Sequence, residues 1–257
     1  MFWLKRFCLI VWVLLITINL NAHHASAAAP GAAALLNIIP GVGYMASGKV
    51  VEGVAWSAVI LGTYVSGLGH FGKNLHFYSI GNIYRRLKPS NRMYYANSET
   101  VFKDYIASYN PLNIIDPFNP PLVGLGALAG SPKVSVGSLV VYSFVGLGEE
   151  GLFRGFFYPA FTDVFFGSKL FGAITSSLVF SAAHAVGGNS SALVPKTFIF
   201  RTLAGLLFCI QTTYHDHDLR KSIFGHTWFD IFVSSKLSVN SRHASNPPLG
   251  LKATFEF

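Results

Sequence analysis

The feature that most constrains this chain is a long apolar run, residues 134–166, that carries two adjacent carboxylates and one guanidinium. A helix needs about 20 apolar residues to cross a bilayer, so the run is long enough for one crossing. The charged residues, Glu149, Glu150 and Arg154, lie inside it in the segment GLGEEGLFRGFFYP. An ionised side chain there is costly unless it is paired, neutral or faces a water-filled cavity. The run therefore predicts a polar site on a membrane helix.

Helical spacing separates the two acids. Glu150 and Arg154 are four residues apart, so on a helix they lie one turn apart on one face and can neutralise each other. Glu149 is rotated to a neighbouring face, where no cation stands at helical spacing. We therefore expect another part of the chain either to make the burial of Glu149 tolerable or to use its carboxylate.

The composition favours a membrane protein over a soluble one. Hydrophobic residues make up 51% of the 257 residues and charged residues 12%, which is about half the usual charged share. The net charge of +8 comes from lysines and arginines clustered between apolar segments, as expected where loops contact lipid headgroups. No basic patch with interleaved aromatic residues is present, so a nucleic-acid partner is not expected. The lipid bilayer is the expected surrounding.

The first 27 residues allow two interpretations. Lys5 and Arg6 precede the mostly apolar run 7–20, and the small residues Ala25-Ser26-Ala27 follow. This order is typical of a secretory signal peptide. An uncleaved first membrane helix is the alternative, since the remaining chain is itself apolar.

Residues 28–130 are expected to form an N-terminal membrane and cytoplasmic region. A span is predicted near 51–71, and the basic segment 73–120 is predicted to be non-spanning and cytoplasmic, with two short helices. The tract 119–130 is short and rich in glycine, so a re-entrant turn or a broken helix is expected as much as a span. Gly43, Gly48 and Lys49 match part of a phosphate-binding loop, but the next residue is valine instead of serine or threonine, so we expect a turn.

Three more apolar helices are predicted after the central run, at 169–186, 196–214 and 222–237. The last two are joined by YHDHD, which we expect to be a solvated turn. Together with the central run they define a predicted core, residues 131–237, followed by a polar tail, 238–257. The predicted fold class is all-α: a multi-pass transmembrane helix bundle of the cell (inner) membrane, with three motif-bearing helices around an intramembrane polar cavity.

Other ionisable residues stand in the predicted apolar helices. His184 has small neighbours on both sides, which allow another helix to approach closely. His226 and Asp230 are four residues apart, hence on one face of one helix. Each feature alone is more often structural. Ionisable residues from three membrane helices together indicate function.

Two kinds of chemistry fit this set. In the first, the Glu149 carboxylate and one imidazole hold a water and take its proton, and a second imidazole on another helix donates a hydrogen bond to the oxyanion that forms when the water attacks a carbonyl; no cofactor is required. In the second, Glu149, His184, His226 and Asp230 are metal ligands, a set that suits zinc. The zinc-protease motif His-Glu-x-x-His and the serine-hydrolase motif Gly-x-Ser-x-Gly are both absent from the sequence.

Three motifs now stand in order: Glu149-Glu150-x-x-x-Arg154, Phe180-x-x-x-His184 and His226-x-x-x-Asp230. This order and spacing resembles the signature of the CPBP intramembrane proteases, which include the type II CAAX-prenyl endopeptidases, over about residues 135–237. The resemblance implies a glutamic intramembrane endopeptidase that cuts a membrane-embedded or membrane-associated peptide or protein. It implies that Glu149 and His184 activate water, that His226 and Asp230 stabilise the oxyanion, and that Glu150, Arg154 and Phe180 support them.

One departure keeps other functions open. These proteases often have asparagine where this chain has Asp230, and an ionised aspartate would repel an oxyanion. The alternatives are a transporter for metal or other ions whose path is lined by the same residues, and a catalytically inactive immunity or scaffold protein.

Overall fold

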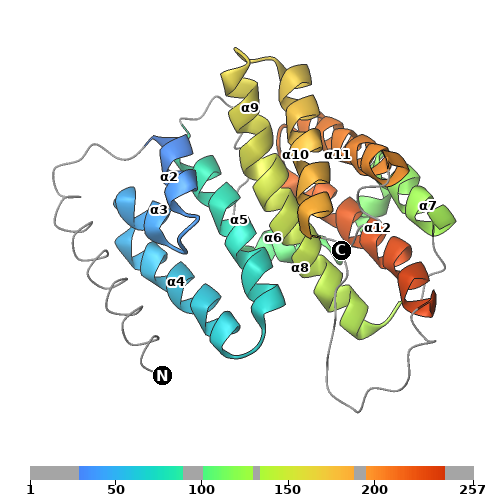
Figure 1. Ribbon diagram of the computed structural model, residues 1–257, viewed down its shortest axis with the longest axis horizontal. Coiled ribbons are helices and arrows are strands. Elements are labelled where there is room, and N and C mark those ends of the chain that lie inside the picture. The colour runs from blue at the N-terminus through green and yellow to red at the C-terminus, as the bar shows by residue number, and fades with distance from the viewer. Residues whose placement is uncertain (1–28, 89–100, 130–133, 188–194, 241–257) are drawn as a thin grey trace.

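The computed structural model describes residues 29–88, 101–129, 134–187 and 195–240, and every regular element in these ranges is a helix (Figure 1). The predicted all-α class is confirmed for this part of the chain. The predicted signal peptide or first helix, residues 1–27, lies outside the described residues, as does the tail beyond residue 240.

A long apolar helix occupies the centre of the molecule. It consists of α8 (Val136–Leu152), a π-helical turn η2 (Phe153–Phe157) and α9 (Tyr158–Val164). A reciprocal capping box starts it: the Ser135 hydroxyl accepts from the amide of Ser138, and the Ser138 hydroxyl accepts from the amide of Ser135. The unit Val136–Val164 is the one helix among the described residues that is long and apolar enough to cross a membrane.

The π-helical turn has a local cause. Pro159, near the start of α9, has no amide hydrogen to donate to the preceding turn. The helix widens there, and the amide of Tyr158 bonds to the carbonyl of Phe153, five residues back. Such turns are frequent at functional sites. This one contains Arg154.

Two helices pack against α8 at close range: α5 (Gly69–Leu87) and α12 (Leu219–Asn240). Gly81 of α5 faces Gly151 of α8, where a Cβ on Gly81 would lie 1.8 Å from the carbonyl oxygen of Gly151. On the other flank, a Cβ on Gly146 would lie 2.6 Å from the hydroxyl of Thr227 in α12. Glycine is required at both crossings because the neighbouring helix occupies the space of a side chain. The two crossings bury the segment of α8 that contains Glu149 and Glu150.

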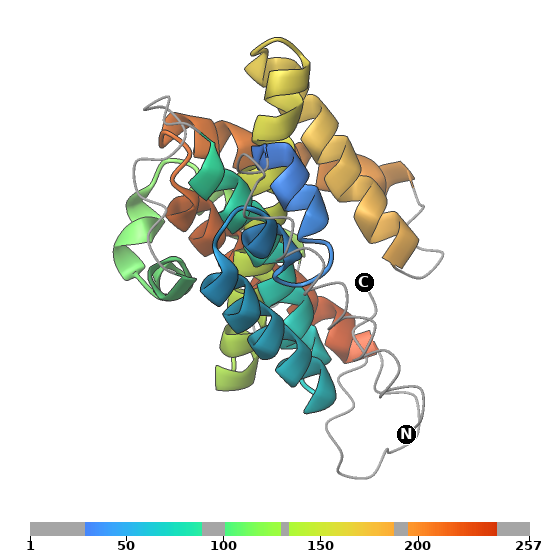
Figure 2. The same cartoon turned by 90° about the vertical axis from the view of Figure 1, so that its left-hand side faces the viewer.

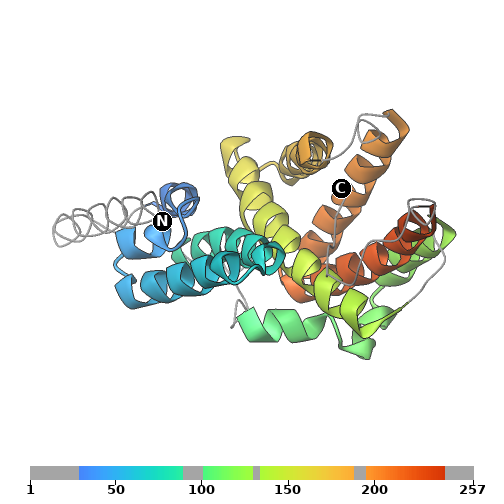
Figure 3. The ribbon, with the colours of Figure 1, turned by 60° about the horizontal axis from the view of Figure 1, so that its bottom comes forward.

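Two more helices complete the region around the site. α10 (Lys169–Gly187) packs against both α9 and α11 (Pro195–Tyr214), and α11 is joined to α12 by a short turn (Figure 2). The observed bounds of α10, α11 and α12 lie within a few residues of the sequence predictions. Figure 3 shows α2–α5 on one side of α8 and α10–α12 on the other.

The predicted span near 51–71 is wrong in its length. After α2 (Pro30–Leu36) and α3 (Val42–Ala46), α4 (Val50–Val65) ends before Gly67, which has a φ of 79°, and α5 then starts at Gly69. A helix of 16 residues extends about 24 Å, which is shorter than a hydrocarbon core of about 30 Å. The left-handed glycine breaks an apolar run that reads as continuous in sequence.

The basic segment 73–120 also differs from the prediction. Its first part belongs to α5, which is largely buried along α8, and it carries Arg85 into the interior. This burial is possible because Arg85 lies 3.3 Å from Asp104, whose carboxylate also accepts a hydrogen bond of 2.6 Å from Tyr78. The two short helices are α6 (Val101–Ala107) and the 3₁₀-helix η1 (Pro111–Ile115). The tract 119–130, for which a span, a re-entrant turn and a broken helix were all open, forms one helix of 11 residues, α7 (Asn119–Ala129), against α12.

The turn between α11 and α12 is more buried than expected. His217 is 6% exposed, has a φ of 64°, and stacks on Tyr158 with 5.4 Å between ring centroids. His215 pairs with the buried carboxylate of Asp116. The prediction of a solvated turn holds for Tyr214 and Asp216, which are exposed, and is wrong for the two histidines, because their imidazoles pack against neighbouring elements.

Candidate active site

One carboxylate oxygen of Glu149 faces two imidazoles from two other helices. Its Oε2 atom lies 3.5 Å from Nε2 of His184 on α10 and 3.5 Å from Nε2 of His226 on α12. These separations exceed the usual hydrogen-bond range of about 2.7–3.2 Å. Glu149, which has no cation at helical spacing in its own helix, thus faces imidazoles from distant parts of the chain.

His226 is held by carboxylates at both ring nitrogens. Nδ1 lies 2.7 Å from Oε1 of Glu150, and Nε2 lies 3.5 Å from Oδ2 of Asp230, one turn further along α12. Because an ionised carboxylate only accepts hydrogen bonds, Nδ1 is the donor to Glu150. The ring also stacks on Phe208, with centroids 4.9 Å apart and planes 16° from parallel. These contacts fix both the position and the plane of the imidazole.

Glu150 forms an ion pair that is buried away from solvent. Its Oε1 atom lies 3.1 Å from Nη1 of Arg154, and both side chains are almost completely buried. The guanidinium lies between the rings of Phe180 and Phe208, 4.8 and 5.0 Å from their centroids, and donates a 3.2 Å hydrogen bond to the carbonyl of Gly205. Arg154 therefore connects α8, α10 and α11 behind His226.

His184 is oriented by its own helix. Nδ1 lies 2.9 Å from the carbonyl oxygen of Phe180, one turn earlier, so Nδ1 carries the hydrogen and donates it. This leaves Nε2 toward Glu149, as an acceptor when the imidazole is neutral. Phe180 thus has two roles: its backbone orients His184, and its ring covers Arg154.

The site is closed on one side and open on the other. Glu149 and His226 are 6% and 3% exposed, whereas His184 and Asp230 are 17% and 21% exposed. Access to the Glu149 carboxylate is therefore along the side formed by His184 and Asp230.

Sequence reasoning missed one residue near the site, Arg201 on α11. Arg201 is partly buried and directly follows Phe200, whose ring stacks on that of Phe229, the residue before Asp230. Its Nη1 atom is buried and makes no hydrogen bond within the described parts of the chain. A signal was available, since Arg201 is the one charged residue in the segment 198–214.

The predicted zinc ligands converge without forming a recognisable metal site. In the ranges that the structure describes, no three His, Cys, Asp or Glu side chains are grouped so that they could hold a metal ion. One ring nitrogen of His226 is already engaged by Glu150.

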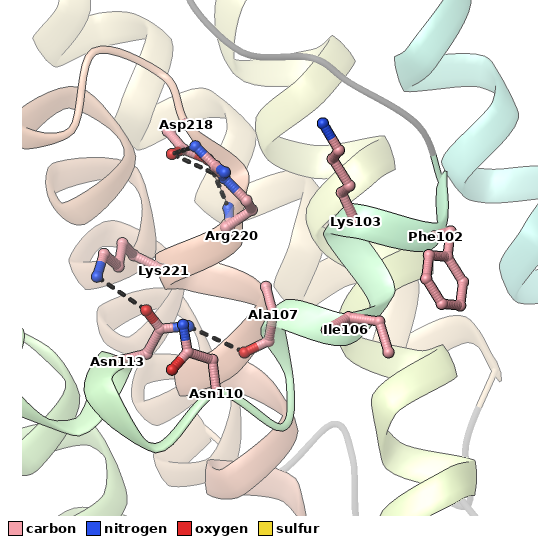
Figure 4. A pocket seen from close by; sticks show the side chains of 9 residues that line it. All are labelled: Phe102, Lys103, Ile106, Ala107, Asn110, Asn113, Asp218, Arg220 and Lys221. Carbon is pink, nitrogen blue, oxygen red and sulfur yellow. Dashed lines mark hydrogen bonds and ion pairs between the residues drawn. The ribbon is translucent and has the colours of Figure 1, made fainter.

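A separate pocket of about 420 Å³ lies between α6 and the start of α12 (Figure 4). Its charged groups are engaged within the protein: Arg220 is turned back onto Asp218, and Lys221 donates a 2.8 Å hydrogen bond to Asn113. None of the predicted site residues lines this pocket.

The described residues thus form an all-helical fold in which a buried carboxylate on a long apolar helix faces two imidazoles from other helices. Residues 131–232 match the model of the family described as type II CAAX prenyl endopeptidase Rce1-like, a family of membrane-embedded proteases. The resemblance read from the three motifs is confirmed. The matched segment is less than half of the chain and contains every predicted site residue. No curated protein and no solved structure matches the chain.

Proposed function

We propose that this chain is an intramembrane endopeptidase that hydrolyses a peptide bond of a membrane-associated peptide or protein, using water activated by Glu149 and His184. The observation that carries the proposal is the position of Glu149 Oε2, 3.5 Å from imidazole nitrogens on two other helices. An ionised Glu149 and a neutral His184 present two acceptors side by side. A water beside them can donate one O–H to each.

In the first step, the water transfers a proton to Glu149 while its oxygen forms a bond to the carbonyl carbon of the substrate. The electron pair of the C=O bond moves to the carbonyl oxygen, which becomes an oxyanion. His226, with Nδ1–H held by Glu150, donates Nε2–H to this oxyanion in its imidazolium form. The donor is already oriented, so little reorganisation is needed during the reaction.

In the second step, the tetrahedral intermediate collapses. The carbonyl re-forms, the C–N bond breaks, and Glu149 gives its proton to the leaving nitrogen. The products are a carboxylic acid and an amine. Glu150, Arg154 and Phe180 take no part in bond changes and hold His226 and His184 in position.

We further propose that α10 and α11 lie in the membrane beside the central helix. Their outward faces carry large apolar side chains, with Leu170 67% exposed and Leu203 55% exposed. The helices have 19 and 20 residues, hence about 28–30 Å of length, close to the thickness of a hydrocarbon core. Lipid chains are a suitable solvent for such faces, whereas water is not. A membrane-embedded substrate would then reach the open side of the site laterally.

The substitution Glu149→Gln tests the function. It keeps the shape of the side chain and removes the base, so cleavage of a library of membrane peptides in detergent is expected to fall by about 10²–10⁴-fold. Glu52→Gln is the matched control, because Glu52 is 41% exposed and pairs with Arg86 away from the site. Equal cleavage by wild type and Glu149→Gln would remove Glu149 from the mechanism and overturn the proposal.

A further inference from the structure

Asp230 places a second carboxylate beside the ring nitrogen that Glu149 faces. Two negative charges therefore share this imidazole, and the oxyanion takes the place of the Glu149 charge once Glu149 has accepted the proton. Its Oδ2 atom lies 3.5 Å from Nε2 of His226, and Glu149 Oε2 lies 3.5 Å from the same nitrogen. In the proposed mechanism this nitrogen donates to the oxyanion. Like charges held this closely in a partly buried site repel strongly, so the site needs a cation beyond His226.

The face of α11 that carries Arg201 is the face turned toward the site. Arg201, Gly205 and Phe208 have i, i+4, i+7 spacing and share one side of the helix. The carbonyl of Gly205 accepts from Arg154, and the ring of Phe208 stacks on His226. Both contacts are part of the site. Arg201 lies on the same face of α11, one turn before Gly205.

The register of α11 against α12 brings Arg201 and Asp230 to the same level. Phe200 and Phe229, which immediately precede them in the chain, stack with centroids 5.8 Å apart. The Arg201 side chain is partly buried. Its buried Nη1–H has no acceptor among the described residues, although a buried donor normally has one.

We propose that Arg201 is a positioning residue that balances the charge of Asp230, so that the Asp230 carboxylate can orient His226 without repelling the oxyanion. This inference rests on the proposed hydrolytic function. It makes the effect of Arg201 depend on residue 230: the cation is needed when that side chain is charged and dispensable when it is neutral. A guanidinium that only joined α11 to α12 would be needed in both cases.

The test compares wild type, Arg201→Gln, Asp230→Asn and the double variant in the membrane-peptide assay. Arg201→Gln is expected to lower kcat/KM about 10-fold or more, mainly through kcat, because its effect falls on the transition state. The double variant is expected to lie within about threefold of Asp230→Asn, which is rescue by removal of the unbalanced charge. Arg201→Lys should keep most of the activity, because it keeps the charge.

The matched control is Arg220→Gln, which breaks the Arg220–Asp218 pair outside the site. Its kcat/KM should equal that of wild type. Full activity of Arg201→Gln would overturn the proposal, as would a double variant no more active than Arg201→Gln.

A second readout keeps the inference separate from the proposed function. The same four proteins are compared by thermal unfolding in detergent, where the shifts of the Arg201 and Asp230 substitutions should be non-additive if the two charges interact. If Glu149→Gln leaves cleavage unchanged, the hydrolytic function fails and this stability cycle decides the pairing. Additive shifts would then overturn it.

Discussion

Adjacent residues in α8 have different environments because successive side chains on a helix differ in direction by about 100°. Glu150 is 0% exposed and contacts Arg154 and His226 inside the protein. Glu149 points toward the open side, where His184 and Asp230 are partly exposed. The same residue type thus has a structural role at one position and, in the proposed mechanism, a chemical role at the next.

Arg154→Met should destabilise the protein strongly, because it leaves the Glu150 carboxylate buried without its guanidinium. Breaking a buried ion pair from one side typically costs about 3–5 kcal/mol. The free energy of unfolding in detergent is the measurement. Arg86→Met, which breaks an exposed pair with Glu52, is the control and should cost no more than about 1 kcal/mol. Similar losses for both variants would contradict a structural role for the buried pair.

The burial of His217 predicts a pH dependence of the free energy of unfolding that comes from this one side chain. Burial, with Lys169 and Lys88 adding to the effect, lowers the pKa of His217 to about 4 from its ordinary value of 6.5. Between about pH 6.5 and pH 4, His217 therefore binds a proton in the unfolded chain but not in the folded chain. Stability is complete above pH 6.5 and falls as the pH drops through this window, by up to about 3 kcal/mol.

The measurement for His217 is the difference in unfolding free energy between wild type and His217→Gln from pH 7 to pH 4. Glutamine does not titrate, so the variant should lack this part of the acid loss while keeping that of all other groups. Parallel pH curves for the two proteins would show that His217 titrates normally in the folded state.

At the scale of elements, the site depends on how closely α5 and α12 approach α8. The approach is set by glycines whose missing side chains are replaced by the backbone or side chain of the neighbouring helix. Glu149 can meet His226 because the crossing at Gly146 brings α12 against the turn of α8 that carries both acids. The glycines near the motif residues are therefore required for close helix packing.

Gly81→Ala should destabilise the crossing of α5 and α8, because the added Cβ would lie 1.8 Å from the carbonyl oxygen of Gly151. Overpacking of this kind costs about 1–3 kcal/mol, and the shifted helix should also lower proteolytic activity. Gly62→Ala in α4 is the control, since nothing lies within 4 Å of its Cβ position. There the change should be neutral or stabilising by up to about 1 kcal/mol. A tolerated Gly81→Ala would show that the crossing has room to relax.

At the scale of the whole molecule, the helices bring three carboxylates and two imidazoles together at the candidate site: those of Glu149, Glu150, Asp230, His184 and His226. The apolar outer faces of α10 and α11 favour a bilayer around this site.

Metal removal separates the two forms of the chemistry. We expect proteolysis by the full-length protein to survive dialysis against a chelator, because Glu149 and His184 can activate water without a metal. The control is the same treatment followed by added zinc, which should change nothing. Loss of cleavage on chelation with recovery on zinc addition would instead assign Glu149, His184, His226 and Asp230 as ligands.

Much of this arrangement was predictable from local patterns. Apolar runs located α8, α10, α11 and α12 within a few residues, and the rarity of charge in those runs selected the motif residues. Pairs within one helix, such as Glu150 with Arg154, follow from the 3.6-residue period alone.

Tertiary structure decided which helices meet, and at what level. It breaks the predicted span near 51–71 at a left-handed glycine, buries Arg85 beside Asp104, and stacks Phe200 on Phe229. It also pairs Nδ1 of His226 with Glu150, which is 76 residues away in sequence, whereas Asp230, one turn along the same helix, lies near Nε2. Local spacing defines the face on which a side chain lies, but its partner across a helix crossing depends on contacts between residues far apart in sequence. Here the small residues at those crossings decide the partner, because they set how closely the helices can approach.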